Sequence, residues 1–419
     1  MYAGIHISNT FICAAITDEN GKTILVTDES IEHDKKFINP LKMYIEDEFA
    51  YLGDKVNYLL ANNYDLNYAS GFLENPEASD TPVYKDGSGQ HWNVAALIAI
   101  FLKKLKTDIL IHNDTPIKSA AVTLSVASTP ALTESLYQAF DMVGIPLAAI
   151  LPVEKAALEG YAITNTENKT QHLFFYYLSP DGVTASISTF NEEDTVEVVH
   201  SATEKELGEQ RLREKFRHFL EERYEHTTGK KIKETPKNLA TLTRLTDELI
   251  AYAVSGVRLY TPLVCAIDDE IIELIITKEQ LSSLLEEYTN ATLSFLKEEL
   301  LHTAGCDAET IAMIVMTGNS ALLPLIEQQL KPLFPGEHQT IYNRKPEEVL
   351  TKGAAAYAGN IGAFATETLP PVETPSGEED LQKKEKETVD PQEPKIKPDT
   401  NTLKKRIRAI HINAGSETM

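Results

Sequence analysis

Two copies of one strand pattern, about 170 residues apart, constrain this chain more than any other feature of its sequence. Apolar and polar residues alternate through residues 2–28, and the Asn20-Gly21 dipeptide indicates a tight turn between two strands. A similar unit covers residues 172–202, with turns at 179–182 and 191–194 between three strands. Because strands and helices alternate after each unit, the repeat indicates a duplication into two α/β halves.

The remaining segments predict how each half is built. Helical periodicity covers residues 93–112, 130–143, 153–163, 204–225, 238–256, 278–304 and 321–330. Further strands are expected at 121–126 and 310–316, and a hairpin at 262–276. These patterns predict a first lobe at 1–168 and a second lobe at 169–345, each with a mixed five-stranded sheet.

Composition excludes several classes of function. The formal net charge is −24, and sequence-independent nucleic-acid binding needs a basic face instead. Cys13, Cys265 and Cys306 form no CxxC pair, so neither a disulfide scaffold nor a cysteine-rich zinc module is expected. The first residues lack a secretory pattern, and the longest apolar run, near residues 94–102, is far shorter than a membrane span. We expect a cytoplasmic protein.

The composition changes near residue 367. Residues 367–419 are rich in Pro, Glu and Lys and poor in large apolar residues until 403, which predicts a disordered, charged tail. Removing this tail is therefore expected to move the melting temperature by no more than about 2 °C. Residues 403–412 mix basic and apolar side chains. Two readings are open: a solvated tail end, or a short amphipathic helix that docks on a partner or an anionic membrane.

Four segments carry a resemblance to a known family. Residues 277–330 resemble a long helix with an "AG" cap, a strand and the "VGGSTRIP" turn, and residues 345–361 are similar to an "NPDEAVAYGAA" helix. Residues 121–161 follow the "VTVPAYF…AGL…EPTAAALAYG" segment, and residues 201–224 resemble "THLGGEDFDNRLVNHF". These are motifs of the ATPase domain of the seventy-kilodalton heat-shock chaperones, the DnaK type, within the actin-like superfamily.

The resemblance implies a two-lobed actin-like ATPase fold with duplicated ribonuclease-H-like lobes. It covers about residues 1–365, with the helix at 346–366 returning to the first lobe. No stretch of this sequence resembles the family's substrate-binding domain, and the tail at 367–419 stands in its place.

The first phosphate loop of the family departs from its pattern here. The family's "DLGTTNS" turn holds phosphates with backbone N–H groups, while its aspartate positions Mg²⁺ and water. This chain has His6 in place of the aspartate, Ser8 for the glycine and Asn9 for the first threonine, and it retains Thr10. An imidazole does not replace a carboxylate in an oxygen-liganded magnesium shell.

The second phosphate loop, "DLGGGTFD" in the family, reads YLSPDGVT. Tyr177 takes the place of the second catalytic aspartate, and Gly182 falls at the hydroxyl position. Pro180 removes a donor N–H, and Asp181 places a negative charge where phosphates would lie. A one-residue shift in the alignment would instead bring Asp181 near the metal.

The adenosine side is altered as well. Glu248 is kept from the family's "ERAKR" helix, but Ala251 and Tyr252 occupy its basic positions, and Leu322 replaces the arginine that stacks on adenine. No lysine stands near 70–73, where the family has a catalytic one, and Ser125 replaces its switch proline. The implied nucleotide-binding set is Ser8, Asn9, Thr10, Gly182, Glu248, Gly318, Asn319, Ser320 and Glu347.

These changes predict no catalytic residue and no metal ligand, and only weak binding of ATP or ADP if any. The leading hypothesis is a chaperone-like protein with a degenerate nucleotide site that acts by binding, as a regulator, co-chaperone or scaffold. One alternative is an ATP-binding chaperone or ATPase with a relaxed site. Another is an actin-like protein recruited to a membrane through residues 403–412. The expected partners are proteins, either chaperone machinery or a client, and not nucleic acid.

Overall fold

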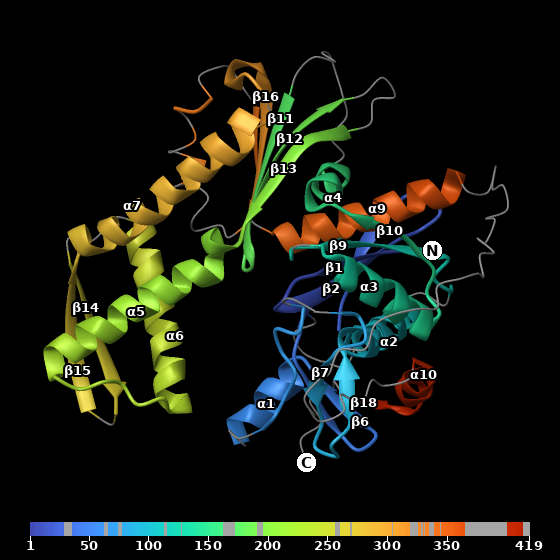
Figure 1. The fold of residues 1–419 in the computed structure, drawn as a ribbon, viewed down its shortest axis with the longest axis horizontal. Helices are drawn as coiled ribbons and strands as arrows, with labels where there is room; N and C mark the ends of the chain where they lie inside the picture. Colours follow the sequence, from blue (N-terminus) through green and yellow to red (C-terminus); the bar gives the residue numbers. More distant parts are fainter. Residues whose placement is uncertain are drawn as a thin grey trace, which may run out of the picture.

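The computed structural model places the chain in two α/β lobes, as the repeat predicts (Figure 1). It describes every residue except 29–35, 63–65, 74–77, 113–114, 127, 162–171, 191–195, 256–259, 269, 304, 319–325, 328–329, 331, 335–338, 344, 365–399 and 414–419.

The first lobe is built on a sheet with strand order β10-β9-β1-β2-β3, to which β4 adds by pairing with β2. This sheet has six strands rather than the five expected, because the short β4 also pairs with β2. β1 runs antiparallel to β2 and parallel to β9. The strands are β1 (Tyr2–Ile7), β2 (Phe11–Thr17), β3 (Thr23–Val26), β4 (Ile38–Pro40), β9 (Ser119–Leu124) and β10 (Leu147–Leu151).

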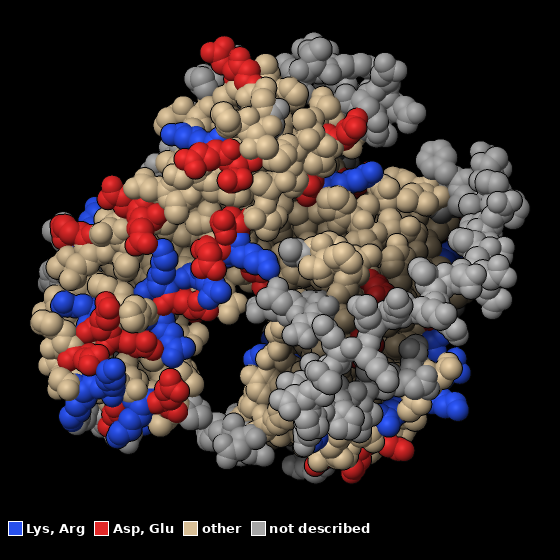
Figure 2. Space-filling model, viewed as in Figure 1, with Lys and Arg blue, Asp and Glu red and all other residues tan. Residues whose placement is uncertain are grey.

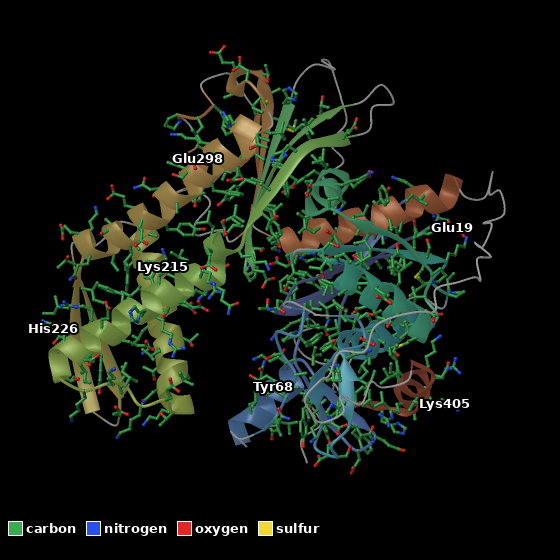
Figure 3. The ribbon with its side chains drawn as sticks, in the orientation of Figure 1. Glu19, Tyr68, Lys215, His226, Glu298 and Lys405 are labelled. Atoms are coloured by element: carbon green, nitrogen blue, oxygen red, sulfur yellow. The ribbon has the colours of Figure 1, made fainter. Side chains whose placement is uncertain are left out.

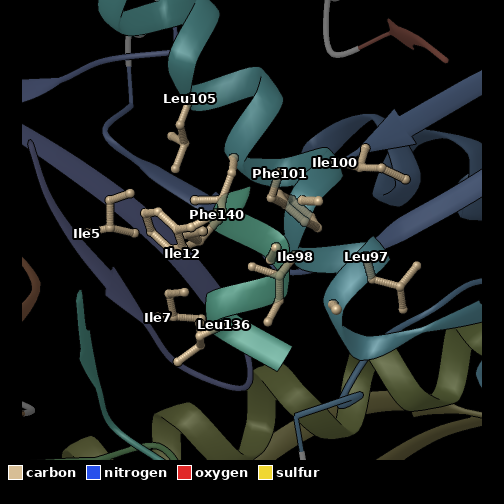
Figure 4. Close-up of a cluster of buried hydrophobic side chains, with 14 of the residues drawn as sticks. Ile5, Ile7, Ile12, Leu97, Ile98, Ile100, Phe101, Leu105, Leu136 and Phe140 are labelled. Atoms are coloured by element: carbon tan, nitrogen blue, oxygen red, sulfur yellow. The ribbon is translucent and has the colours of Figure 1, made fainter. Parts of the chain in front are cut away.

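Helices cover both faces of this sheet (Figure 1). On one face α2 (Val94–His112) and α3 (Pro130–Val143) pack over the strands, and Figure 4 shows Ile5, Ile7 and Ile12 among side chains of these helices. Thr129 caps α3 by accepting a hydrogen bond from the backbone of Leu132, and Gly144 ends it in the left-handed conformation.

The opposite face carries α9 (Pro346–Phe364) and α4 (Val153–Gly160), which cross each other at glycines. A Cβ at Gly353 would lie 1.7 Å from the carbonyl oxygen of Ala156, and one at Gly4 would lie 2.1 Å from the nitrogen of Ala355. Only glycine permits this approach. α9 therefore lies directly on the first-lobe sheet although it follows the second lobe in sequence.

A smaller part of the first lobe projects beyond α2. It contains two hairpins and a helix: β5 (Met43–Glu46) with β6 (Phe49–Leu52), β7 (Pro82–Lys85) with β8 (His91–Asn93), and α1 (Asp54–Asn62). These elements were not predicted from the sequence, and strands of three or four residues show too little alternation to be recognised.

The second lobe has a five-stranded sheet in the order β13-β12-β11-β16-β17. Its strands are β11 (His172–Ser179), β12 (Gly182–Phe190), β13 (Val196–Glu204), β16 (Ile311–Gly318) and β17 (Gln339–Asn343). Along β11, Phe174 and Tyr176 point into the core of this lobe, whereas Phe175 and Tyr177 pack with α4 and α9. Because successive side chains of β11 point to opposite faces of the sheet, one face of this strand belongs to the second-lobe core and the other packs on the first lobe.

Helices and a hairpin complete the second lobe (Figure 1). They are α5 (Glu209–Thr228), α6 (Pro236–Ser255), β14 (Tyr260–Ile267), β15 (Glu270–Thr277) and α7 (Lys278–Phe295), with single turns at Lys205–Leu207 and Ala308–Thr310. Thr277 and Gln280 form a capping box at the start of α7, which continues as a π-helix over Leu296–His302. The helix expected at 321–330 lies mostly outside the described residues.

The tail differs from its prediction. Residues 367–399 lie outside the described residues, but α10 (Thr400–Ala409) and β18 (His411–Asn413) pack on the first lobe. Leu403, Ile407 and Ile410 belong to the first-lobe core, so residues 400–413 are not a solvated end. Deleting them is expected to destabilise the first lobe, because this buried apolar area would be lost. The apolar residues are three or four apart and form one helix face, which is buried here. No described helix is long and apolar enough to cross a membrane.

Candidate functional site

A pocket of about 250 Å³ between the lobes is the candidate site. Leu73, Ser125 and Thr129 line it from the first lobe, whereas Asp181 and Arg211 are among the residues that line it from the second. A second pocket of about 330 Å³ adjoins it and shares Ser125. The β1–β2 turn and the β11–β12 turn, which the resemblance implies as phosphate loops, both lie at this junction through the contact described below.

The β1–β2 turn uses its own hydroxyl group to satisfy its backbone. Ser8 Oγ accepts hydrogen bonds from the backbone N–H groups of Thr10, at 3.1 Å, and Phe11, at 3.0 Å. The N–H of Ser8 donates to the carbonyl of Phe11 at 2.9 Å. These donors are therefore engaged within the turn, and a phosphate would have to compete with Ser8 for them.

The β11–β12 turn is closed in a similar way. Ser179 Oγ accepts from the N–H of Asp181 at 3.1 Å and donates to the carbonyl of Gly182 at 2.9 Å. Pro180 has no N–H to offer. Gly208 packs so closely on this turn that a Cβ would lie 2.5 Å from the nitrogen of Gly182. Gly182 is therefore a packing position, and its amide faces Gly208.

One hydrogen bond connects the two turns across the lobes. The N–H of Asn9 donates to Oδ2 of Asp181 at 3.1 Å, over 172 positions in the sequence. Asp181 thus presents an anionic oxygen to a first-loop N–H group, the role that the resemblance assigns to a nucleotide phosphate. Within the described residues, no three His, Cys, Asp or Glu side chains gather as a metal site.

His6 is fully buried in β1. It pairs with Cys13 and Thr123 on the neighbouring strands, and its ring centroid lies 5.4 Å from that of Phe11. Burial lowers the pKa of His6 from 6.5 to about 3, so the imidazole is neutral at physiological pH. A neutral, enclosed imidazole offers no negative charge to Mg²⁺.

Tyr177 is equally enclosed. Its ring packs against Val153 and Leu350 between β11, α4 and α9. Burial raises the pKa of Tyr177 well above its ordinary value, with further contributions from the charges of Glu347 and Asp181. The phenol therefore stays neutral and acts as an inter-lobe packing group at the position of the second carboxylate.

Among the described residues of the first lobe, none that lines this pocket is a cation. Phe72 and Leu73 are buried side chains, and Leu73 lines the pocket where the resemblance expects a lysine nearby. From the second lobe, Arg211 reaches the pocket, but its guanidinium pairs with Glu214 at 2.7 Å and Glu206 at 3.5 Å. Lys205 also lines the pocket from the second lobe, so the positive charge of this pocket comes from that lobe.

Of the adenosine-side residues, the structure describes Glu248, Gly318 and Glu347. Glu248 pairs with Arg244 on α6, and Gly318 ends β16 with φ at +139°. Glu347 lies in the first turn of α9, where burial raises the pKa of its carboxyl. Asn319 and Ser320 lie outside the described residues. Of the predicted set, the structure brings Ser8, Asn9, Thr10 and Gly182 to the inter-lobe junction.

From the sequence, Asp181 was interpreted as a charge that repels phosphates or, after a shift of the alignment, as a residue near the metal. Its hydrogen bond to Asn9 was not foreseen. Arg211 and Gly208 were missed as well. Their signal was present in residues 201–224, where the similarity to "THLGGEDFDNRLVNHF" already contains a glycine at a turn and an arginine on the following helix.

Comparison with known proteins agrees with this architecture. The sequence model of the HSP70 family, described as Hsp70 protein, matches residues 65–369. The chain is similar to the chaperone protein dnaK1 of a Nostoc species, with 23% identity over 326 residues, which are 76% of this chain and 46% of that protein. It is 22% identical to the chaperone protein DnaK of Trichormus variabilis over the same shares, and 23% identical to dnaK3 of Synechococcus elongatus over 65% of this chain and 36% of that protein.

The chain spans just under half the length of the first two relatives and about a third of the third. The family match includes α2, β9 and β10 of the first lobe, the second lobe and α9. On this evidence, the chain is a divergent member of the HSP70 family with the actin-like ATPase fold.

Proposed function

We propose that this HSP70-family chain acts by binding other proteins, as a regulator, co-chaperone or scaffold, and does not turn over ATP. Family membership supports a chaperone-like role at the family level. The hydrogen bond from Asn9 to Asp181 carries the more specific part. The Asp181 carboxylate accepts a hydrogen bond from the N–H of Asn9, so this bond links the two lobes at the place where a phosphate would otherwise bind.

The neighbouring side chains support the same proposal. Hydrolysis needs a held Mg²⁺, a positioned water and positive charge at the transferring phosphoryl group. His6 and Tyr177 are neutral and buried, Leu73 is apolar, and Arg211 is paired with carboxylates. Each missing contribution costs on the order of 10²-fold in rate.

Surface charge is consistent with protein rather than nucleic-acid partners. Figure 2 shows basic and acidic side chains interspersed over the α5–α7 part of the second lobe, with no basic face in this view. Lys215, labelled in Figure 3, pairs with Glu287 at 2.9 Å in this region. The cytoplasmic location remains part of this proposal.

A phosphate-release assay with purified full-length chain and MgATP tests the proposal, together with calorimetric titration of MgATP and MgADP. We expect no turnover above background and at most weak binding. Replacing His6 and Tyr177 together by Asp is expected to leave the chain inactive, because the closed turns and the missing lysine remain.

The decisive control compares Thr10→Ala with Thr243→Ala, an exposed substitution on α6 far from the turn in sequence. Magnesium-dependent phosphate release that Thr10→Ala abolishes and Thr243→Ala preserves would refute the proposal. That outcome would favour the second candidate, an ATP-binding chaperone with a relaxed site. The inter-lobe pocket favours that candidate.

A further inference from the structure

Residues 400–413 form a docked arm on the first lobe, and this name is used for them below. Leu403 and Ile407 on one face of α10, and Ile410 directly after it, are 0%, 1% and 4% exposed and join the core beside α2 (Figure 1). The opposite face is polar, and Lys405 extends away from the lobe (Figure 3). The arm therefore presents an amphipathic helix whose apolar face fits this lobe.

A single lysine holds the carbonyl end of the arm helix. Lys103 Nζ, from α2, donates to the carbonyl oxygens of Ile407 at 2.9 Å, Arg408 at 3.0 Å and Ile410 at 2.8 Å. Burial lowers the pKa of Lys103. A cation at this end satisfies carbonyls that the helix leaves without intrahelical partners and complements the helix dipole. Lys404 adds an ion pair with Asp141 of α3.

The arm ends in a strand that extends a first-lobe hairpin. β18 runs parallel to β6, with His411 opposite Phe49, and the N–H of His411 donates to the carbonyl of Glu48 at 2.7 Å. The rings of Phe49 and His411 lie 5.5 Å apart. Helix docking and strand addition together make a specific recognition site for a helix-strand segment.

The connection of the arm allows it to reach a neighbouring molecule. About 35 residues separate α9 from α10, enough to span about 120 Å if fully extended. An isolated helix of ten residues is marginal in water, so the arm is expected to fold only when docked. The described contacts of the arm with α2, Asp141 and β6, and the core cluster that it joins, all belong to the first lobe, so the acceptor is one lobe of one molecule.

We propose that the arm is exchangeable, and that the acceptor site on the first lobe binds the arm of a second copy of this chain. The contacts are the same in both arrangements, so only the connection decides between them. A linker of this length and composition gives an effective concentration on the order of millimolar for the arm of the same molecule. Docking of a neighbour's arm therefore competes with docking of the molecule's own arm when the protein concentration approaches the millimolar range.

Disulfide trapping tests the proposal on the full-length chain. Neighbouring strand residues lie about 4.8 Å apart, within the Cα separation that a disulfide spans. One chain carries Phe49→Cys and another carries His411→Cys, both with Cys265 and Cys306 replaced by Ser and the buried Cys13 retained. The two chains are mixed near millimolar concentration and oxidised with copper phenanthroline, and a disulfide-linked dimer is expected. The fraction of chains in this dimer should fall about tenfold when the mixture is diluted tenfold before oxidation.

Three controls make the result decisive. A chain with both substitutions should cross-link within itself at low concentration, which shows that the docked register is correct. Replacing the second chain by one with Lys405→Cys, an exposed position outside the strand pairing, measures random collision. Hydrogen exchange of β1 and β2 verifies that each variant is folded.

Absence of the mixed dimer above the Lys405→Cys background, with efficient cross-linking inside the double variant, would overturn the proposal. So would release of the arm only on addition of vesicles rich in anionic lipid, which would identify a membrane as its ligand.

Discussion

Replacing Asp181 by Asn should increase nucleotide affinity without creating an ATPase. The structure places Oδ2 of Asp181 3.1 Å from the N–H of Asn9, a donor that a phosphate would use. At about 4 Å and an effective dielectric constant near 20, a carboxylate and one phosphate charge repel by about 4 kcal/mol. Solvent exposure and salt reduce this to about 1.5–3 kcal/mol. The expected gain in affinity for MgADP or MgATP is therefore about 10- to 100-fold.

Isothermal titration of MgADP and MgATP into the full-length chain measures this gain. Asp181→Glu keeps the negative charge and is expected to bind no more tightly than the wild type. Glu206→Gln removes an exposed carboxylate from the same pocket and is expected to change affinity by less than about threefold, because exposed charges are screened. Phosphate release should stay at background in every variant, since His6 and Tyr177 are unchanged.

Equal affinities of Asp181→Asn and the wild type would refute the reasoning, because the carboxylate would then not oppose phosphate in this cleft. Micromolar binding by the wild type would refute it as well. It would mean that the bond between Asn9 and Asp181 opens at little cost when nucleotide arrives.

Three further perturbations test other parts of the structure. Lys104→Met leaves Asp28 and Asp108 buried without their shared cation, now 3.0 and 2.7 Å away, and should lower the free energy of urea unfolding by about 3–5 kcal/mol. Adding Asp28→Asn and Asp108→Asn should restore most of the lost free energy of unfolding. A Lys104→Met variant with a free energy of unfolding within about 1 kcal/mol of the wild type would contradict this account. Ile407→Ala removes a buried contact of the arm and should speed hydrogen exchange of α10 at least about tenfold while α2 is unaffected; equal acceleration in both would show that the arm belongs to the global folding unit. Burial keeps His6 neutral down to a pKa of about 3, whereas the unfolded histidine takes up a proton below 6.5. The free energy of unfolding should therefore fall by about 1.4 kcal/mol per pH unit as pH drops through that window. His6→Phe should remove this contribution from the pH profile, and an unchanged slope would contradict it.

Local pattern predicted the elements that depend on neighbours in sequence. Alternation and the Asn20-Gly21 dipeptide predicted the turn between β2 and β3 but did not separate β1 from β2. α7 begins at the expected residue, Lys278, after the capping box of Thr277 and Gln280. The losses at His6 and Tyr177 were visible as residue types, because no fold gives an imidazole or a phenol the charge of a carboxylate. Short strands such as β4 and β18 were missed, since three residues carry too little periodicity.

The sequence by itself determined the two-lobed plan, because the repeated alternation defines which faces must be buried and both halves share it. It also determined that the carboxylates expected at the phosphate loops are missing. Only the tertiary structure decided that Asp181 reaches Asn9 and that Leu403 and Ile407 join the first-lobe core. These partners lie more than 170 residues apart along the chain, and whether they meet depends on how complete lobes pack and not on any local pattern.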